Sequence, residues 1–150
     1  MSLPAQQHPA AAETLRRFAG ALDAQAFDKA IGLFTENAEY SVFLRHNYEH
    51  SGVLSLISEN VPALRNRCSM HRTGPLDVVR HVVGLADISP GKEQDIVRAT
   101  ANFTASYSGR HVFAGEYRAQ LKNVGGDWLI DQLLVLLDGD HVPAAIRTPI

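Results

Sequence analysis

Apolar positions near the start of the chain repeat with the period of an α-helix. From Ala10 onward the apolar stripe consists of Leu15, Phe18, Ala19 and Leu22, and a second stripe consists of Phe27, Ala30, Ile31 and Phe34. Spacings of three and four residues are typical of amphipathic helices. We therefore predict two short helices in series, and we expect the carboxylate of Asp23 to cap the second by accepting its free backbone N–H groups.

A short strand is predicted at residues 38–44, where apolar and polar side chains alternate. Helical spacing returns between residues 51 and 70, but Pro62 cannot donate a backbone hydrogen bond inside a helix. We expect two short helices in this segment, with the break at Asn60 or Val61. Pro62 then lies in the first turn of the second helix, where it is tolerated.

The second half of the chain, from about residue 78 to residue 137, has the composition of successive β-strands. Residues 96–107 alternate most clearly, so one face of that strand is predicted to meet the core. The turn signals are Ser89-Pro90-Gly91, Ser108-Gly109 and Gly125-Gly126-Asp127. Helices first and long strands later predict an α+β domain in which N-terminal helices pack on a curved antiparallel sheet. A pocket between the sheet and the helices is possible in such a cone.

Composition agrees with a single globular domain spanning residues 1–150, with a polar lead-in at residues 1–9. The chain has 45% apolar and 20% charged residues, and its net charge of -2 gives no broad basic field for nucleic acid. No apolar run approaches the roughly 20 residues that span a bilayer. The single cysteine, Cys68, excludes an intramolecular disulfide and suits a reducing compartment, so we expect a cytoplasmic protein without a membrane partner.

Among the seven histidines, His81 is the strongest candidate for chemistry. It lies in an apolar strand, where burial would keep it near neutral and usable as an acid or base. The favoured alternative is a core histidine that hydrogen-bonds to the backbone or to a carboxylate. No Cys/His cluster typical of structural zinc is present, and an iron site built by two histidines and a carboxylate from distant strands has little support.

Further polar residues are candidates for lining the pocket or for contacting other subunits. Tyr40, His46, Tyr48, Tyr117 and Asp131 are predicted to point into the space between sheet and helices. Arg65, Arg67, Arg72 and Arg80 form a basic series that favours an interface or an internal salt bridge over an anionic substrate. No glycine-rich phosphate loop or Gly-x-Ser-x-Gly elbow supports nucleotide binding or serine hydrolysis.

Several local strings together resemble the small, or β, subunit of bacterial aromatic-ring-hydroxylating dioxygenases, a branch of the NTF2-like, SnoaL-like superfamily. The strings are Leu22-Asp23, Phe27-Asp28, Leu33-Phe34-Thr35-Glu36-Asn37-Ala38-Glu39-Tyr40, Asn47-Tyr48-Glu49, Leu64-Arg65-Asn66-Arg67, Arg72-Thr73-Gly74, Arg80-His81-Val82-Val83, Trp128-Leu129-Ile130 and Leu136-Leu137-Asp138-Gly139-Asp140. The resemblance implies an NTF2-like cone and a subunit without catalytic residues of its own.

The resemblance also implies partners and cofactors. The chain is expected to form a homotrimer and to join a larger α subunit in an α3β3 complex, and the α subunit is expected to carry a Rieske iron–sulfur cluster and a mononuclear iron used in aromatic hydrocarbon catabolism. One cysteine cannot supply the two cysteine ligands of a Rieske centre. Contacts with neighbouring chains are expected from Tyr48, Arg65, Arg72, Arg80, Arg98, Asn102, Thr104, Glu116 and Arg118.

A stand-alone SnoaL-like isomerase, dehydratase or cyclase is the alternative. A ketosteroid-isomerase-like mechanism needs a carboxylate and a phenol where this chain has Val42 and Phe18. A scytalone-dehydratase-like arrangement is the better match, and it requires that His81, Tyr40 and Asp131 converge in the cone. A binding module without chemistry is a third reading.

Overall fold

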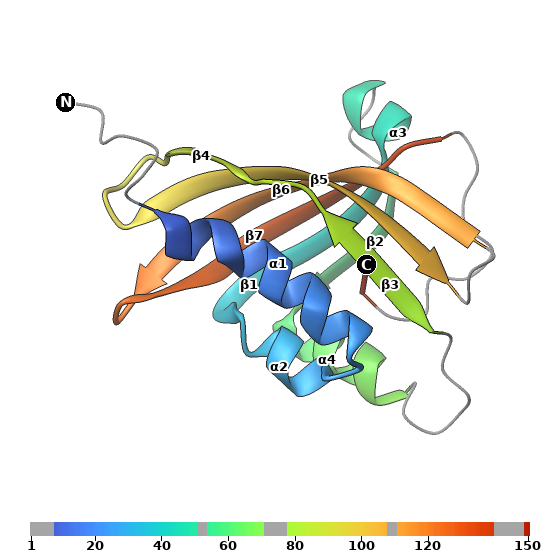
Figure 1. Ribbon diagram of the computed structural model, residues 1–150, viewed down its shortest axis with the longest axis horizontal. Coiled ribbons are helices and arrows are strands. Elements are labelled where there is room, and N and C mark those ends of the chain that lie inside the picture. The colour runs from blue at the N-terminus through green and yellow to red at the C-terminus, as the bar shows by residue number, and fades with distance from the viewer. Residues whose placement is uncertain (1–7, 51–53, 71–77, 108–110, 140–148) are drawn as a thin grey trace.

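The computed structural model describes residues 8–50, 54–70, 78–107, 111–139 and 149–150. Its helices are α1 (Pro9–Asp23), α2 (Phe27–Ile31), α3 (Arg45–His50) and α4 (Val61–Met70). Its strands are β1 (Phe34–Leu44), β2 (Ser55–Asn60), β3 (Val79–Val83), β4 (Asp87–Pro90), β5 (Ile96–Tyr107), β6 (His111–Val124) and β7 (Asp127–Leu137). Figure 1 shows α1 lying across one face of a single curved sheet, with α2 and α4 beside it. The predicted α+β class is confirmed.

The strands follow the order β2-β1-β7-β6-β5-β3, and β4 pairs with β5 near one end. Strands β5, β6 and β7 form a meander of long antiparallel hairpins, as the alternation predicted. Gly125 and Gly126 make the two-residue turn between β6 and β7 with φ angles of 61° and 97°, which side chains disfavour. The strand pair β1–β7 is parallel, so the sheet is mixed rather than purely antiparallel.

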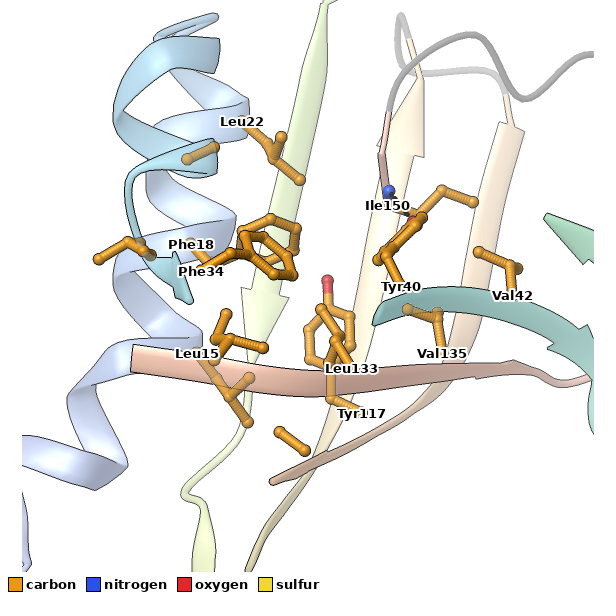
Figure 2. Packing of buried hydrophobic residues seen from close by; sticks show 14 of the residues in the cluster. Leu15, Phe18, Leu22, Phe34, Tyr40, Val42, Tyr117, Leu133, Val135 and Ile150 are labelled. Atoms are coloured by element: carbon orange, nitrogen blue, oxygen red, sulfur yellow. Dashed lines mark hydrogen bonds between the residues drawn. The ribbon is translucent and has the colours of Figure 1, made fainter. Parts of the chain in front are cut away.

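The core lies between α1 and the face of the sheet toward it, called the inner face here. Helix α1 buries one stripe that includes Leu15, Phe18 and Leu22, and β5 turns every second residue from Val97 to Tyr107 inward. Full burial of a side chain such as Phe18 contributes about 1.5–3 kcal/mol. All of these residues belong to one buried cluster inside the cone, and Figure 2 shows Leu15, Phe18 and Leu22 of α1 meeting side chains of the sheet there.

Three predictions about local structure need correction. Residues 55–60 are strand β2 rather than a helix, because Ile57 pairs with Val42 of β1 and turns into the core. The expected helix at Pro62 is confirmed as α4, and the Asn60 Oδ1 accepts the Ala63 N–H at 3.0 Å at its start.

Asp23 does not cap α2. The residue before α2 is Ala26, without a side-chain cap, and the Asp23 carboxylate instead contacts β3. Helix α2 also ends at Ile31, so Phe34 belongs to β1. Packing of its ring against Phe18, with ring centroids 5.5 Å apart, explains why Phe34 fitted the apolar stripe.

Two residues of the predicted lead-in, His8 and Pro9, are part of the folded domain, since Pro9 starts α1 and the His8 ring meets the edge of Trp128 at 5.2 Å. Residues 1–7 and the Ser108-Gly109 turn lie outside the described residues. None of the described helices is both long and apolar enough to cross a membrane.

Candidate functional site in the cone and on the outer sheet face

Asp23, the last residue of α1, and His81, in the middle of β3, meet in the cone. The Nδ1 of His81 lies 2.6 Å from Asp23 Oδ1, and the His81 backbone N–H donates to the two carboxylate oxygens at 2.9 and 3.1 Å. The side chains of His81 and Asp23 are 1% and 19% exposed. The predicted core histidine bound to a carboxylate is therefore what the structure contains.

The chemistry of this pair follows from which nitrogen carries hydrogen. A carboxylate only accepts hydrogen bonds, so the contact places the hydrogen on His81 Nδ1 and, in the neutral ring, leaves the lone pair on Nε2. A histidine whose ring is oriented by a carboxylate in this way has the arrangement that a general base requires. His81 Nε2 is buried and has no hydrogen-bond partner among the described residues.

Aromatic rings line the cone next to His81. The ring of Phe103 lies 6.3 Å from His81 and stacks on Tyr117 at 4.2 Å. The hydroxyl of Tyr117 is also buried without a hydrogen-bond partner among the described residues, and burial raises its pKa well above the usual range. In Figure 2 this hydroxyl points between Phe18 and Tyr40. It is therefore a neutral hydrogen-bond donor inside an apolar space.

The structure places Tyr40 and Asp131 with other partners. Burial raises the pKa of Tyr40, although the backbone N–H of Ile150, which donates to its hydroxyl oxygen at 2.9 Å, acts in the opposite direction. Asp131 Oδ1 accepts a hydrogen bond from Thr35 Oγ1 at 2.7 Å. The carboxylate beside His81 is Asp23, which sequence reasoning had assigned to a helix cap.

A second feature lies on the outer face of the sheet, opposite α1. A hollow of about 390 Å³ there is lined by Tyr48, Arg98 and Arg118, three of the residues predicted to contact other subunits. Arg98 donates to the Pro90 carbonyl at 3.3 Å, and Arg118 is paired with Glu116. The remaining lining residues are Glu39, Ser41, Phe43, Ala99, Thr100, Ala119, Gln120, Gln132, Leu133 and Leu134.

The other predicted arginines are separate from this hollow. Arg65 lines a different hollow, of about 600 Å³, between α2, the start of β1 and α4. Arg80 is exposed on β3, and Arg72 lies outside the described residues. Arg67 forms the internal salt bridge that the basic series suggested, with Glu59 at 2.5 Å, and the pairing raises the pKa of its guanidinium.

One pair of histidines with His-x-x-x-His spacing was not predicted. His46 and His50 are one turn apart on α3 with ring centroids 4.1 Å apart, and the spacing of four residues was the available signal. Both rings are exposed, and His50 Nδ1 lies 2.9 Å from the His46 carbonyl oxygen. In the part of the chain that the structure describes, no three His, Cys, Asp or Glu side chains gather in a way that would hold a metal ion.

Comparison with known proteins identifies the family of this fold. The SnoaL-like domain family matches residues 5–133, which is most of the chain. The chain belongs to this family. A comparison with curated protein sequences finds no match for this SnoaL-like domain.

Solved structures share the cone. A protein from Novosphingobium aromaticivorans, described as the β subunit of an aromatic-ring-hydroxylating dioxygenase, has a TM-score of 0.81 at 22% identity, over 92% of this chain and 93% of that one. The β subunit of benzoate 1,2-dioxygenase from Burkholderia mallei has a TM-score of 0.64 at 19% identity, over 83% and 85% of the two chains. The predicted resemblance is thus confirmed for an NTF2-like, SnoaL-like fold.

The same fold also occurs in an enzyme-like neighbour. A protein from Novosphingobium aromaticivorans described as a scytalone dehydratase has a TM-score of 0.67 at 15% identity, over 92% of this chain and 89% of that one. Identities this low show a shared fold only. The activity of this SnoaL-like domain must be inferred from its own residues. The outer hollow and the Asp23–His81 pair are the features of this chain that bear on function.

Proposed function

We propose that this chain is a non-catalytic β subunit of a cytoplasmic aromatic-ring-hydroxylating dioxygenase that acts in aromatic compound catabolism. In this role it forms a trimer and supports a larger α subunit in an α3β3 complex. The Rieske cluster and the mononuclear iron belong to that α subunit.

The observation that carries the proposal is the open outer face of the sheet. Helix α1 covers the inner face, whereas Val82 and Val112 on the outer face are 71% and 70% exposed. The hollow with Tyr48, Arg98 and Arg118 lies on the same face. Tyrosine and arginine are enriched in protein interfaces, where they combine apolar contact area with hydrogen bonding. An outer face of this composition fits a surface that other subunits cover.

The test is co-expression with a chain that carries a Rieske Cys-x-His and Cys-x-x-His pair, followed by light scattering. We expect the isolated chain to form a trimer of 16.4 kDa protomers and to elute with the α chain and its iron. Arg98→Glu should weaken the complex by about 10- to 100-fold, because it places a negative charge opposite α-chain groups that would otherwise face the Arg98 cation.

Arg17→Glu is the matched control, because Arg17 is exposed on α1, away from the outer face. It should leave the complex intact. A chain that stays monomeric or dimeric and ignores the α chain at every concentration tested would contradict the proposal.

The Asp23–His81 pair favours a second candidate, an acid–base enzyme of the dehydratase, isomerase or cyclase type acting in the cone. His81 Nε2 would take a proton from a carbon next to a carbonyl group, and the electron pair of that C–H bond would move onto the carbonyl oxygen. The Tyr117 hydroxyl would donate a hydrogen bond to this oxygen. Both groups are buried, and the Phe103 ring lies beside both side chains, 6.3 Å from the His81 ring and stacked on Tyr117 at 4.2 Å.

This candidate is tested by proton exchange, because the first step requires no knowledge of the final product. Purified protein should exchange the α-protons of a small cyclic ketone with deuterated water, as followed by NMR. His81→Gln should abolish the exchange, whereas His46→Gln, which changes an exposed histidine, should not. Equal exchange by both variants would exclude the role of His81.

A further inference from the structure

Pro149 and Ile150 lie inside the cone. Pro149 is buried and Ile150 is 0% exposed, and both are separated in sequence from β7. Ile150 belongs to the same buried cluster as Tyr40, Val42, Tyr117 and Val135. Figure 2 shows it beside Tyr40. These two residues therefore occupy interior space that the secondary-structure elements alone do not fill.

Ile150 is held there by two kinds of interaction. Its side chain is enclosed by apolar and aromatic groups, and its backbone N–H donates to the Tyr40 hydroxyl oxygen at 2.9 Å. Tyr40 is itself 2% exposed, so this oxygen has left water and needs a donor. A molecule that replaced Ile150 would need a compact apolar body and one N–H or O–H group.

We propose that the cone is a binding cavity which Pro149 and Ile150 fill, and that they exchange there with a small, mainly apolar ring compound bearing one N–H or O–H donor. The donor takes the place of the Ile150 N–H on the Tyr40 hydroxyl, and the ring takes the place of the isoleucine side chain. This inference does not depend on assembly with an α subunit. For the acid–base candidate, it supplies the step that opens the cone.

The exchange has a thermodynamic consequence. A ligand that binds only when Ile150 has left has an apparent affinity reduced by the fraction of molecules in which the cavity is open. Shortening Ile150 lowers the competition, so binding should become tighter although no ligand contact is added. The effect on a bound phenol should be about tenfold or more.

The experiment compares phenol with toluene, which has a similar ring without the donor. Calorimetric titration should give at least about tenfold tighter phenol binding to Ile150→Ala than to the unchanged protein. Leu85→Ala is the control, because Leu85 is 99% exposed. The preference for phenol over toluene should disappear when Tyr40→Phe is added to Ile150→Ala.

A second measurement uses the unchanged protein. Saturating phenol should accelerate deuterium exchange of the Ile150 amide in NMR spectra, because that amide loses its acceptor. Phenol binding with an unaltered Ile150 amide, or equal phenol affinity in the unchanged protein and Ile150→Ala, would overturn the proposal. If Ile150→Ala fails to fold, Ile150→Val and the amide measurement still decide. Complex formation with an α chain is read separately by light scattering.

Discussion

Removing the Asp23 carboxylate should destabilise the protein far more than removing an exposed aspartate. In Asp23→Ala, the His81 ring N–H and the His81 backbone N–H lose the acceptor that lies 2.6 to 3.1 Å away. The His81 side chain is 1% exposed, so water cannot easily replace the carboxylate at the ring. A buried donor left without a partner costs about 1–3 kcal/mol.

The two donors differ in how much of this cost applies. The ring N–H bears it in full, whereas the backbone N–H belongs to a residue of intermediate exposure and is partly rehydrated. We expect the free energy of unfolding to fall by about 3 kcal/mol in Asp23→Ala. Asp23→Asn keeps one acceptor oxygen and should lose about half as much.

Urea unfolding, followed by the fluorescence of the single tryptophan and by circular dichroism, measures these values. The control is Asp87→Ala, an exposed aspartate on β4, which should change stability by no more than about 0.5 kcal/mol. If Asp23→Ala and Asp87→Ala cost the same, the contact with His81 contributes nothing measurable and the reasoning is refuted.

Two further substitutions probe the packing of the cone. Tyr117→Phe should leave the free energy of unfolding in urea unchanged or raise it by up to about 1 kcal/mol, because the buried Tyr117 hydroxyl has no partner among the described residues. A fall of more than about 1 kcal/mol would show that this hydroxyl has a hydrogen-bond partner. Gly115→Ala should lower the free energy of unfolding by about 2–3 kcal/mol, and the melting temperature with it, because the new Cβ would lie 2.1 Å from the Leu136 carbonyl oxygen. Wild-type stability in Gly115→Ala would contradict the close approach of β6 and β7.

Periodicity predicted the elements whose burial is set by one face. The stripe through Leu15, Phe18 and Leu22 became α1, and the alternation in residues 96–107 became β5, because one side of each meets the core. For residues 55–60, periodicity predicted a helix, and this was wrong. Their single buried residue, Ile57, fits either period, and pairing with β1 decided the outcome.

The polar site was harder to predict because its partners are far apart in sequence. Spacing identified His81 as a buried histidine, but its partner Asp23 is 58 residues away and has the local signature of a helix cap. Similarly, nothing in the local sequence indicated that Ile150 would reach the hydroxyl of Tyr40, 110 residues away. Such contacts follow from how α1, β3 and residues 149–150 meet around the sheet, which short-range patterns do not encode.

The two candidate functions use the Asp23–His81 pair differently. In a structural role, the Asp23 carboxylate accepts the backbone N–H of His81 on the edge strand β3. This contact keeps that N–H from pairing with another strand. This role requires only the contacts at the backbone and at Nδ1.

The structural role does not explain why a second ring nitrogen, Nε2, is buried without a partner among the described residues. An unpaired buried acceptor is unfavourable and requires a specific explanation. A ring compound that displaces Ile150 and reaches Nε2 would satisfy this atom. The occupant of the cone, rather than the sheet that encloses it, therefore decides whether this domain only supports a partner or also performs chemistry.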